Sequence, residues 1–201
     1  MIKTSGIVIG THNKNKKEEI RKILTGMSLP LLNLEDFDDA PDIVEDGVTF
    51  EENATKKALQ LAKFCNMSVI ADDSGLEIDA LDKRPGVYSS RYCGEDTGYE
   101  EKCLKLFEEL KNVPFDKRTA RFRCAIALAE PGKLHFVVEA SCEGLINLEP
   151  LGCKMVSMSL RLSVCIARFL ANPPIPTILD GSKTSTNFLI ATYKEGGAKS
   201  P

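Results

Sequence analysis

Two adjacent carboxylates interrupt an apolar stretch of the chain. Asp72 and Asp73 follow the apolar run 69–71 and precede a Ser-Gly pair. Neighbouring negative charges repel, and removing them from water is costly unless a positive group lies beside them. Magnesium prefers oxygen ligands and takes one or two protein carboxylates together with substrate phosphates, which Asp72, Asp73 and Glu45 could supply. A carboxylate beside such a metal can also accept a proton from an attacking water. An acidic loop that ends a strand explains the same residues equally well.

A second polar segment, THNKNK at residues 11–16, follows an expected strand and precedes an expected helix. Backbone N–H groups at a helix N-terminus favour anions, and the Thr, Asn and Lys side chains add donors. The segment therefore has the chemistry of a phosphate-binding turn, although it lacks the GxxxxGK[ST] pattern of a Walker loop. Taken alone, a polar turn with lysines is more often simply solvated.

Two further segments carry charged residues at suggestive spacings. In VEDGVTFEENATKKA, residues 44–58, Glu45 precedes a glycine turn, and Asn53 and Lys57 lie four apart on one helix face. An ordinary amphipathic helix with a solvated side accounts for the same pattern. In RPGVYSSRYCGE, residues 84–95, Arg91 could pair with carboxylates or stack on a tyrosine, and a structural role is at least as plausible. The two histidines, His12 and His135, are too far apart in sequence to indicate a nucleophilic triad.

Alternating and helical spacings predict the elements that must position these groups. Strands are expected at 6–10, 68–71, 76–81, 119–129 and 133–142, and the last two are joined by a hairpin turn. Helices are expected at 16–24, 49–65 and 98–110, the second with a capping box formed by Thr49 and Glu52. Residues 31–48 are expected to be an acidic loop and residues 72–75 an acidic turn, with Glu77 and Asp79 facing solvent. Helices and strands that alternate with hairpins predict an α/β fold with a mixed sheet.

The bulk properties exclude several classes of protein. The chain has 201 residues, 43% of them hydrophobic, and a net charge of −3, which argues against a general nucleic-acid binder. No stretch has the length of a membrane helix, so no membrane partner is expected. The seven cysteines are odd in number and form no CxxC pair, which favours reduced thiols and a cytoplasmic location over zinc or disulfides.

Taken together and in order, six stretches resemble the inosine triphosphate pyrophosphatase family of bacterial type. They are THNKNK, EDGVTFEENATKKA, ADDSGLEIDAL, RPGVYSSRY, RTARFRCAIAL and EGLINLEPLG, and they span roughly residues 5–152. The resemblance implies an elongated, two-lobed α/β fold and, in general, a homodimer. It also implies Mg²⁺-dependent hydrolysis of ITP, dITP and XTP to the monophosphate and pyrophosphate, which removes deaminated purine nucleotides from the pool.

The resemblance also implies roles for individual residues. Asp73 would be the general base, and Glu45, Asp73 and Asp72 would form the acidic metal site. Ser74 would contact the substrate. The phosphates would be held by Lys57 and by the turn after the first strand, which consists of Thr11, His12, Asn13, Lys14, Asn15 and Lys16.

The resemblance ends near Gly152. The family continues with a Gly-Phe-Gly-Tyr-Asp-Pro segment and later a Ser-His-Arg element that build its base pocket, and neither occurs here. The chain is therefore expected to divide into an inosine triphosphatase-like domain, 1–152, and a divergent, poorly ordered segment, 153–201, whose only helix-like stretch is 155–171. In a neighbouring reading frame, codons for residues 154–157 can encode Asn-Gly-Phe and those for 188–191 can encode Ser-His-Arg. The resulting hypothesis is a frameshift, an altered exon or a sequencing error near residue 152.

Three functional hypotheses follow. The first is an active nucleoside triphosphate pyrophosphatase. The second is a catalytically impaired nucleotide- and metal-binding remnant that lacks the base pocket. The third is a related pyrophosphatase with a different base pocket. A pocket discriminates through hydrogen bonds that a wrong ligand cannot make, so selectivity separates the first hypothesis from the second.

Overall fold

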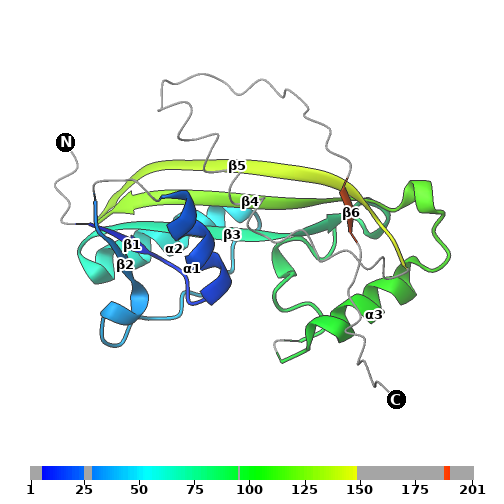
Figure 1. The fold of residues 1–201 in the computed structure, drawn as a ribbon, viewed down its shortest axis with the longest axis horizontal. Helices are drawn as coiled ribbons and strands as arrows, with labels where there is room; N and C mark the ends of the chain where they lie inside the picture. Colours follow the sequence, from blue (N-terminus) through cyan, green and yellow to red (C-terminus); the bar gives the residue numbers. More distant parts are fainter. Residues whose placement is uncertain (1–5, 25–28, 95, 149–187, 191–201) are drawn as a thin grey trace, which may run out of the picture.

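Three long antiparallel strands, β3 (Ser68–Ile78), β4 (Thr119–Glu130) and β5 (Lys133–Ile146), form the centre of the protein (Figure 1). The computed structural model describes residues 6–24, 29–94, 96–148 and 188–190. The six-stranded sheet has the order β2-β1-β3-β4-β5-β6. The short strands β1 (Ile7–Ile9), β2 (Leu31–Asn33) and β6 (Phe188–Ile190) make the parallel pairs β1–β2, β1–β3 and β5–β6. The predicted α/β class with a mixed sheet is therefore confirmed.

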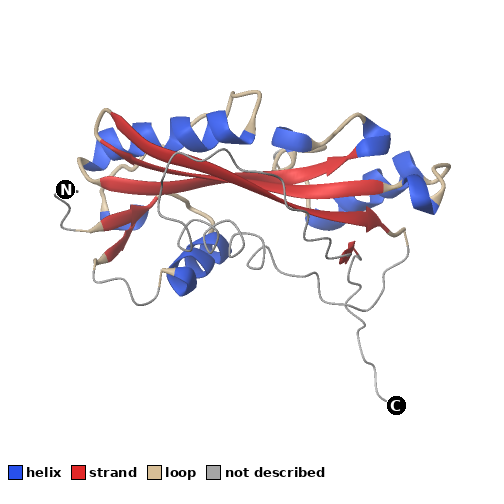
Figure 2. Cartoon of the chain, turned by 90° about the horizontal axis from the view of Figure 1, so that it is seen from above, coloured by secondary structure: helices blue, strands red, loops and turns tan. Residues whose placement is uncertain are grey.

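Helices flank both faces of this sheet (Figure 2). The described residues form three α-helices, α1 (Lys14–Ile23), α2 (Phe50–Cys65) and α3 (Tyr99–Leu110). Four short 3₁₀ helices connect the main elements: Leu34–Asp36, Asp79–Leu81, Gly86–Tyr88 and Phe115–Lys117. Of the described part of the chain, no helix combines the length and apolar character needed to cross a membrane.

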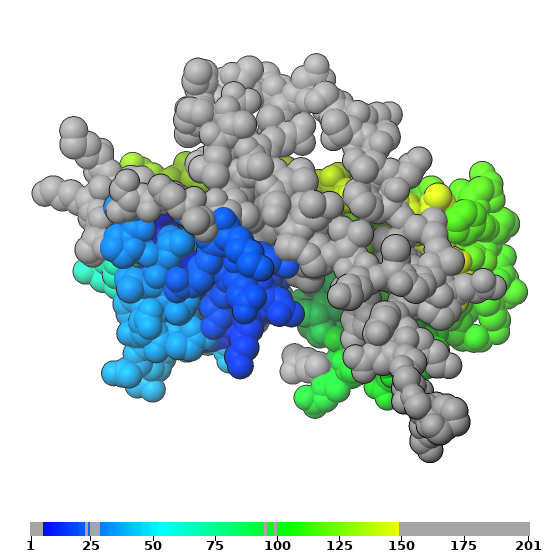
Figure 3. All heavy atoms as spheres, in the orientation of Figure 1, coloured from blue at the N-terminus to red at the C-terminus, as the bar shows by residue number. Residues whose placement is uncertain are grey.

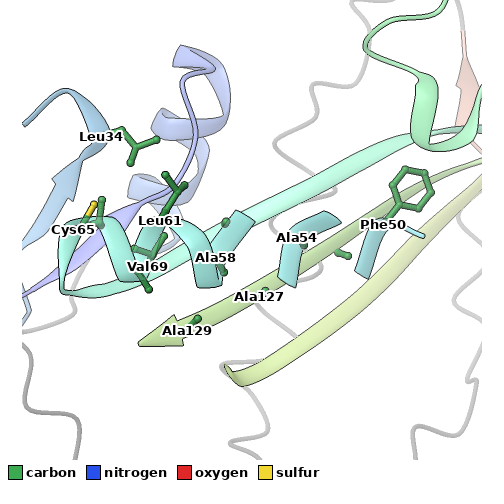
Figure 4. Packing of buried hydrophobic residues seen from close by; sticks show 13 residues of the cluster. Leu34, Phe50, Ala54, Ala58, Leu61, Cys65, Val69, Ala127 and Ala129 are labelled. Carbon is green, nitrogen blue, oxygen red and sulfur yellow. The ribbon is translucent and has the colours of Figure 1, made fainter. Parts of the chain in front are cut away.

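Helix α2 packs closely on the sheet because both surfaces carry alanine. Ala54 and Ala58 of the helix are fully buried against a face of the sheet that includes Ala127 and Ala129 of β4 (Figure 4). Small side chains on both sides let the helix approach the strands without leaving voids. The helix begins as predicted, since Thr49 Oγ1 accepts a hydrogen bond from Glu52 N–H. Glu52 itself accepts from Val48 N–H rather than from Thr49, so the expected capping box is shifted by one residue.

Helix α1 covers the opposite face of the sheet. Ile20 of α1 and Leu24, which caps its C-terminus, pack against Ile70 of β3 and Ile126 of β4. These two strand residues alternate along their strands with the residues that face α2. The helix begins at Lys14, two residues earlier than predicted. Asn13 is the reason, because its Oδ1 accepts hydrogen bonds from the N–H groups of Asn15 and Lys16 and so caps the helix.

A third apolar cluster lies at the other end of the long strands. It joins Leu106 and Leu110 of α3 to Leu76 and Ile78 of β3. The long strands thus carry two groups of elements, with α1, β1 and β2 at one end and α3 at the other. Figure 3 shows the corresponding blue and green segments at opposite ends of the long axis. The predicted elongated, two-lobed shape is confirmed.

The predicted acidic turn at 72–75 is wrong, because β3 runs through it without interruption. Asp73 pairs with Ala125, and Gly75 pairs with Arg123, in a continuous antiparallel ladder with β4. The chain does not need Gly75 to make a turn, but it does need a residue without a side chain at this position. A Cβ on Gly75 would overlap the carbonyl oxygen of Gly86 and the hydroxyl of Ser89, so only glycine lets the 86–89 segment approach the strand.

Three smaller expectations are also wrong. Residues 31–33 of the presumed acidic loop form β2, which pairs in parallel with β1. Residues 79–81 form a 3₁₀ helix instead of the end of a strand. Glu77 is buried rather than solvent-facing, because Arg121 and Arg123 lie within 3.5 Å and 3.3 Å of its carboxylate. Apart from β6, the segment 153–201 lies outside the described residues, and so does the helix expected at 155–171.

Candidate functional site

The site lies where β1 leaves the sheet and β3 continues. The pairing of β1 with β3 ends at Ile9–Ile70. Beyond that pair, the chain after β1 turns away toward α1 beside residues 72–74 of β3. A pocket of about 250 Å³ opens at this point. Residues from the turn after β1, from the 41–45 segment, from α2 and from β3 line it, so segments far apart in sequence meet there.

Most of the residues predicted for the site line this pocket. Four come from the turn after β1 and the start of α1: Thr11, His12, Asn13 and Lys16. Four come from the other segments: Glu45, Lys57, Asp73 and Ser74. Lys14, Asn15 and Asp72 do not line the pocket. Lys14 and Asn15 are exposed in the first turn of α1, because that helix starts at residue 14.

Asp73 lies on the face of the sheet covered by α2. Its Oδ2 accepts a hydrogen bond of 2.9 Å from the amide of Asn53, and its Oδ1 accepts one of 2.8 Å from Ser74 N–H. Asp73 as a whole is 5% exposed. Burial and, second to it, the negative charge of Glu45 raise the pKa of Asp73 to about 6. The group therefore changes protonation near neutral pH, as a general base requires.

Asp72 points to the opposite face, toward α1. Adjacent residues of a strand project to opposite sides, so Asp72 and Asp73 do not lie side by side as the sequence suggested. Lys16 Nζ lies 2.6 Å from Asp72 Oδ2, and the aspartate side chain is 1% exposed. Burial lowers the pKa of Lys16, but the charge and hydrogen bond of Asp72 raise it by more, so its pKa lies above the ordinary value. Lys16 thus balances the charge of Asp72.

Lys57 connects the two halves of the site. Its ammonium donates a 2.8 Å hydrogen bond to the backbone oxygen of Asp72 and forms an ion pair with Glu45. Its positive charge also acts on Asp73, where it lowers the pKa and partly offsets the effect of burial. The side chain is 13% exposed, so little water screens these interactions.

The loop that carries Glu45 is held by backbone contacts. Arg91 Nη2 donates a 2.8 Å hydrogen bond to the carbonyl oxygen of Glu45, and its guanidinium stacks over the Tyr88 ring at 4.8 Å. The predicted stacking of Arg91 on a tyrosine is therefore present. Its predicted ion pair with a carboxylate is replaced by a hydrogen bond to the backbone oxygen of Glu45. The contact links the 84–94 segment to the site without placing Arg91 in the pocket lining.

The carboxylates of the pocket suit a magnesium ion that is also bound by substrate phosphates. Glu45 and Asp73 bring two hard carboxylates to one pocket, and the repulsion between their negative charges, which is the second cause of the raised pKa of Asp73, would be relieved by a cation between them. Within the described residues, no group of three or more His, Cys, Asp or Glu side chains is arranged to hold a metal. Magnesium ordinarily takes one or two carboxylates and completes its shell with substrate phosphates and water, which fits a two-carboxylate set.

Several residues of the site were not among those predicted. Ser90 and Asp42 line the pocket, and His12 Nε2 lies 3.4 Å from Asp42 Oδ1. Asn53 contacts Asp73 directly and is fully buried. Its spacing of four residues from Lys57 was the available signal, because that spacing puts both side chains on one helix face. No sequence pattern marked Ser90 or Asp42.

A search for related proteins finds one family model that matches the chain, the Ham1 family, over residues 7–156. Among the relatives, the dITP/XTP pyrophosphatase of Geobacter sulfurreducens is 49% identical over 146 residues, which are 73% of each chain. The dITP/XTP pyrophosphatase of Bacillus subtilis is 45% identical over 152 residues, which are 76% of this chain and 77% of the relative.

Solved structures give the same relationship. A HAM1 protein from Coxiella burnetii superposes with a TM-score of 0.68 and 37% identity, covering 74% of this chain and 76% of the other. The Staphylococcus aureus Ham1 protein superposes with a TM-score of 0.66 and 36% identity, covering 74% of this chain and 76% of the other.

Proposed function

The chain belongs to the Ham1 family and is by descent a nucleoside triphosphate pyrophosphatase, and we propose that it hydrolyses the deaminated purine nucleotides ITP, dITP and XTP. The products are the monophosphate and pyrophosphate. The observation that carries the proposal is the convergence of Lys16, Lys57, Glu45 and Asp73 on one pocket, since these residues supply two cations and two carboxylates for a magnesium triphosphate.

The two lysines hold the phosphates. Lys16 enters the pocket from α1 and Lys57 from α2, so a triphosphate between them contacts an ammonium on each side. The turn at residues 11–13 contributes polar groups at the N-terminus of α1, where the helix dipole favours an anion. Lys14 and Asn15 are exposed outside the lining, and any contact they make is with the outer part of the ligand. Ser74 contacts the substrate from β3.

Asp73 acts as the general base. Its carboxylate accepts the proton of the attacking water, and its pKa of about 6 leaves it ionised at neutral pH yet basic enough for that step. The amide of Asn53 and the N–H of Ser74 fix the orientation of the carboxylate by one hydrogen bond to each oxygen. Asp72 supports the reaction indirectly, because it holds Lys16 in place from the other face of the strand.

Glu45 and Asp73 are the residues that would hold the magnesium ion. When bound, magnesium neutralises the negative charge of the phosphate oxygens and acts as a Lewis acid. Lys57 already lies against Glu45, so the residues of the site hold that carboxylate in position before any ligand enters. Asp72 faces Lys16 and is proposed to influence the metal only through its charge.

Pyrophosphate release tests the proposal. Purified protein with Mg²⁺ is given ITP, dITP and XTP and, for comparison, ATP and GTP, with a chelator and an Asp73→Asn variant as controls. We expect release from the first three nucleotides that exceeds release from ATP and GTP and disappears with the chelator. Equal release from all five nucleotides would contradict the proposed selectivity.

A second candidate is a nucleotide- and metal-binding member of the family whose turnover is impaired. The observation in its favour is that the family match ends at residue 156 of 201. We propose that 1–152 forms the pyrophosphatase domain and that 153–201 diverges from the family because of a frameshift. Binding of ITP without pyrophosphate release from folded protein would favour this candidate. Sequencing the DNA across codon 152 tests the frameshift, which fails if the neighbouring frame lacks the family motifs.

Two further properties complete the proposal. The protein is proposed to form a homodimer, which size-exclusion chromatography with light scattering would test. It is also proposed to work in the cytoplasm, since its seven cysteines without a CxxC pair suit a reducing compartment. Neither nucleic acid nor membrane is proposed as a partner, in keeping with a net charge of −3.

A further inference from the structure

We propose that Asn53 is a positioning residue that fixes the Asp73 carboxylate and the Glu45 loop in one rigid arrangement. The inference rests on the proposed function, because it assigns Asn53 a part in holding the two carboxylates of that site. Asn53 does not line the pocket and is fully buried behind it. It therefore acts through its neighbours rather than on the substrate.

The side chain of Asn53 forms a bridge between β3 and the Glu45 loop, in addition to the contacts that Lys57 makes with both. Its Nδ2 donates a 2.9 Å hydrogen bond to Asp73 Oδ2 on β3. Its Oδ1 accepts a 2.8 Å hydrogen bond from the N–H of Gly47, two residues after Glu45. One amide group thus joins strand and loop by a donor on one side and an acceptor on the other.

The first turn of α2 holds the loop closely enough for this bridge to form. Glu52 Oε2 accepts a 2.8 Å hydrogen bond from the neighbouring Val48 N–H. A Cβ on Gly47 would lie only 2.7 Å from Asn53 Oδ1, so glycine is required for the loop to approach this near. Arg91 holds the carbonyl oxygen of Glu45 from the other side of the loop. The loop backbone is therefore fixed on both sides of the carboxylate.

The bridge requires a neutral amide. An aspartate at 53 would keep the acceptor for Gly47 but would replace the donor with a carboxylate facing Asp73, and the two charges would repel. An alanine would remove both hydrogen bonds and leave buried polar groups on Asp73 and Gly47 without this partner. Asparagine is the residue that donates to a carboxylate and accepts from a backbone N–H in the same geometry.

A positioning role predicts a specific kinetic pattern. In the described part of the chain, Lys16 and Lys57 bond to Asp72 rather than to the Asn53 side chain, so phosphate binding is expected to persist in Asn53→Asp. We expect kcat to fall about 10- to 100-fold, the usual cost of losing an outer-shell partner, with KM for ITP changed less than threefold. The matched control is Asn66→Asp, which makes the same chemical change at the exposed C-terminal cap of α2 and should retain the wild-type kcat.

A second readout is independent of turnover. NMR hydrogen exchange of the Gly47 amide, in protein without metal or nucleotide, reports the bridge directly. We expect about tenfold faster exchange in Asn53→Ala. We also expect faster exchange in Asp73→Ala, because the loss of its acceptor releases the Asn53 amide that holds Gly47. A side chain that merely stabilised α2 would not transmit a change at Asp73 to Gly47.

The outcomes separate this inference from the proposed function. If wild-type protein releases pyrophosphate and Asn53→Asp keeps kcat within threefold, the positioning role is overturned and the function stands. If wild-type protein releases none, the proposed function fails, and the Gly47 exchange in Asp73→Ala alone decides the bridge. Unchanged exchange in that variant overturns it, and faster exchange supports it.

Discussion

Two charged clusters lie along β3, and they balance their charges in opposite ways. The Arg121 cluster, made of Glu77, Asp79, Arg121 and Glu143, is joined by the fork of one guanidinium, which contacts Asp79 at 2.9 Å and 3.0 Å and Glu143 at 3.1 Å. The site cluster, made of Glu45, Asn53, Lys57 and Asp73, has only the point charge of an ammonium. The first cluster is saturated with hydrogen bonds, whereas the second keeps capacity for another cation.

The pKa values express the same difference. The Arg121 guanidinium holds the pKa of Asp79 well below its usual range, so that carboxylate is fully ionised and satisfied. Burial and the charge of Glu45 raise the pKa of Asp73 to about 6, although Asn53 and Lys57 both favour its charged form. Both clusters contain buried carboxylates and both are hydrogen-bonded. The two clusters therefore differ both in burial and in the partner cation, because Asp73 is buried beside an ammonium, whereas Asp79 is 30% exposed and is held by a guanidinium.

The largest expected effect is on turnover in Asp73→Asn. The amide cannot accept the proton of water, so kcat should fall about 10³-fold, within the range for loss of a general base. The melting temperature should change little, because the removal of a buried charge offsets the loss of one of the two hydrogen bonds that Asp73 accepts. Pyrophosphate release and thermal melts measure the two effects, with Asp79→Asn as the matched variant from the other cluster. More than a tenth of wild-type kcat in Asp73→Asn would contradict the assignment.

The next effect is on stability in Asp72→Asn. This change leaves Lys16 charged and buried without its carboxylate, which should cost about 3 kcal/mol in the free energy of unfolding. Urea denaturation measures the loss. The double variant Asp72→Asn with Lys16→Met should recover part of the stability, since no unpaired charge remains. A loss below about 1 kcal/mol would mean that water solvates Lys16 despite its burial.

The pH dependence of stability should also separate the clusters. In the metal-free protein, a pKa of Asp73 raised from 3.8 to about 6 means that the folded state binds more protons than the unfolded state between these values. Stability from this group is therefore highest below pH 3.8 and is lost as the pH rises through 6, with a slope of at most about 1.4 kcal/mol per pH unit. Denaturation in EDTA at several pH values measures the slope, which Asp73→Asn should abolish.

The smallest effect is expected in the Arg121 cluster. Asp79 is 30% exposed, so Asp79→Asn should cost about 1 kcal/mol in unfolding free energy and leave kcat unchanged. Because the folded pKa of Asp79 is lowered, its contribution is present above pH 3.8 and is lost as the pH falls, the reverse of Asp73. Urea denaturation at pH 7 and pH 3 measures both. A fall in kcat would show that the two clusters are coupled.

The sequence predicts most helices and strands correctly, but it does not predict the full length of β3 or the side of the sheet to which each of its residues points. Helix α2 and the β4–β5 hairpin follow regular apolar spacings, and those spacings record which side is buried. Strand β3 was divided because Asp-Asp-Ser-Gly has the composition of a turn. Tertiary contacts keep this strand extended. They are the ladder with β4, the approach of the 86–89 segment to Gly75 and the pairing of Asp72 with Lys16.

The sequence predicts most of the residues of the site but not how their side chains are arranged. Glu45, Lys57 and Asp73 do line one pocket, but Asp72 does not, because neighbouring residues of a strand face opposite ways. Asn53 was missed as a site residue because an asparagine on a helix has many uses, and only its buried contacts with Asp73 and Gly47 reveal this one. Glu77 was placed in solvent because its partners, Arg121 and Arg123, lie more than forty residues away in the chain.

The uninterrupted course of β3 limits how this chain can vary in length. Deleting one residue between Ser68 and Ala71 would turn Asp73 toward α1 and Asp72 toward α2, because side chains alternate along a strand. Lys16 and Asn53 would then each face the wrong neighbour, and Gly75 would no longer lie opposite the 86–89 segment. A paired insertion or deletion would restore the alternation but would shift Asp72, Asp73 and Gly75 two positions along β4. Substitutions alone preserve both the alternation and the register that keep a lysine on one side and an amide on the other.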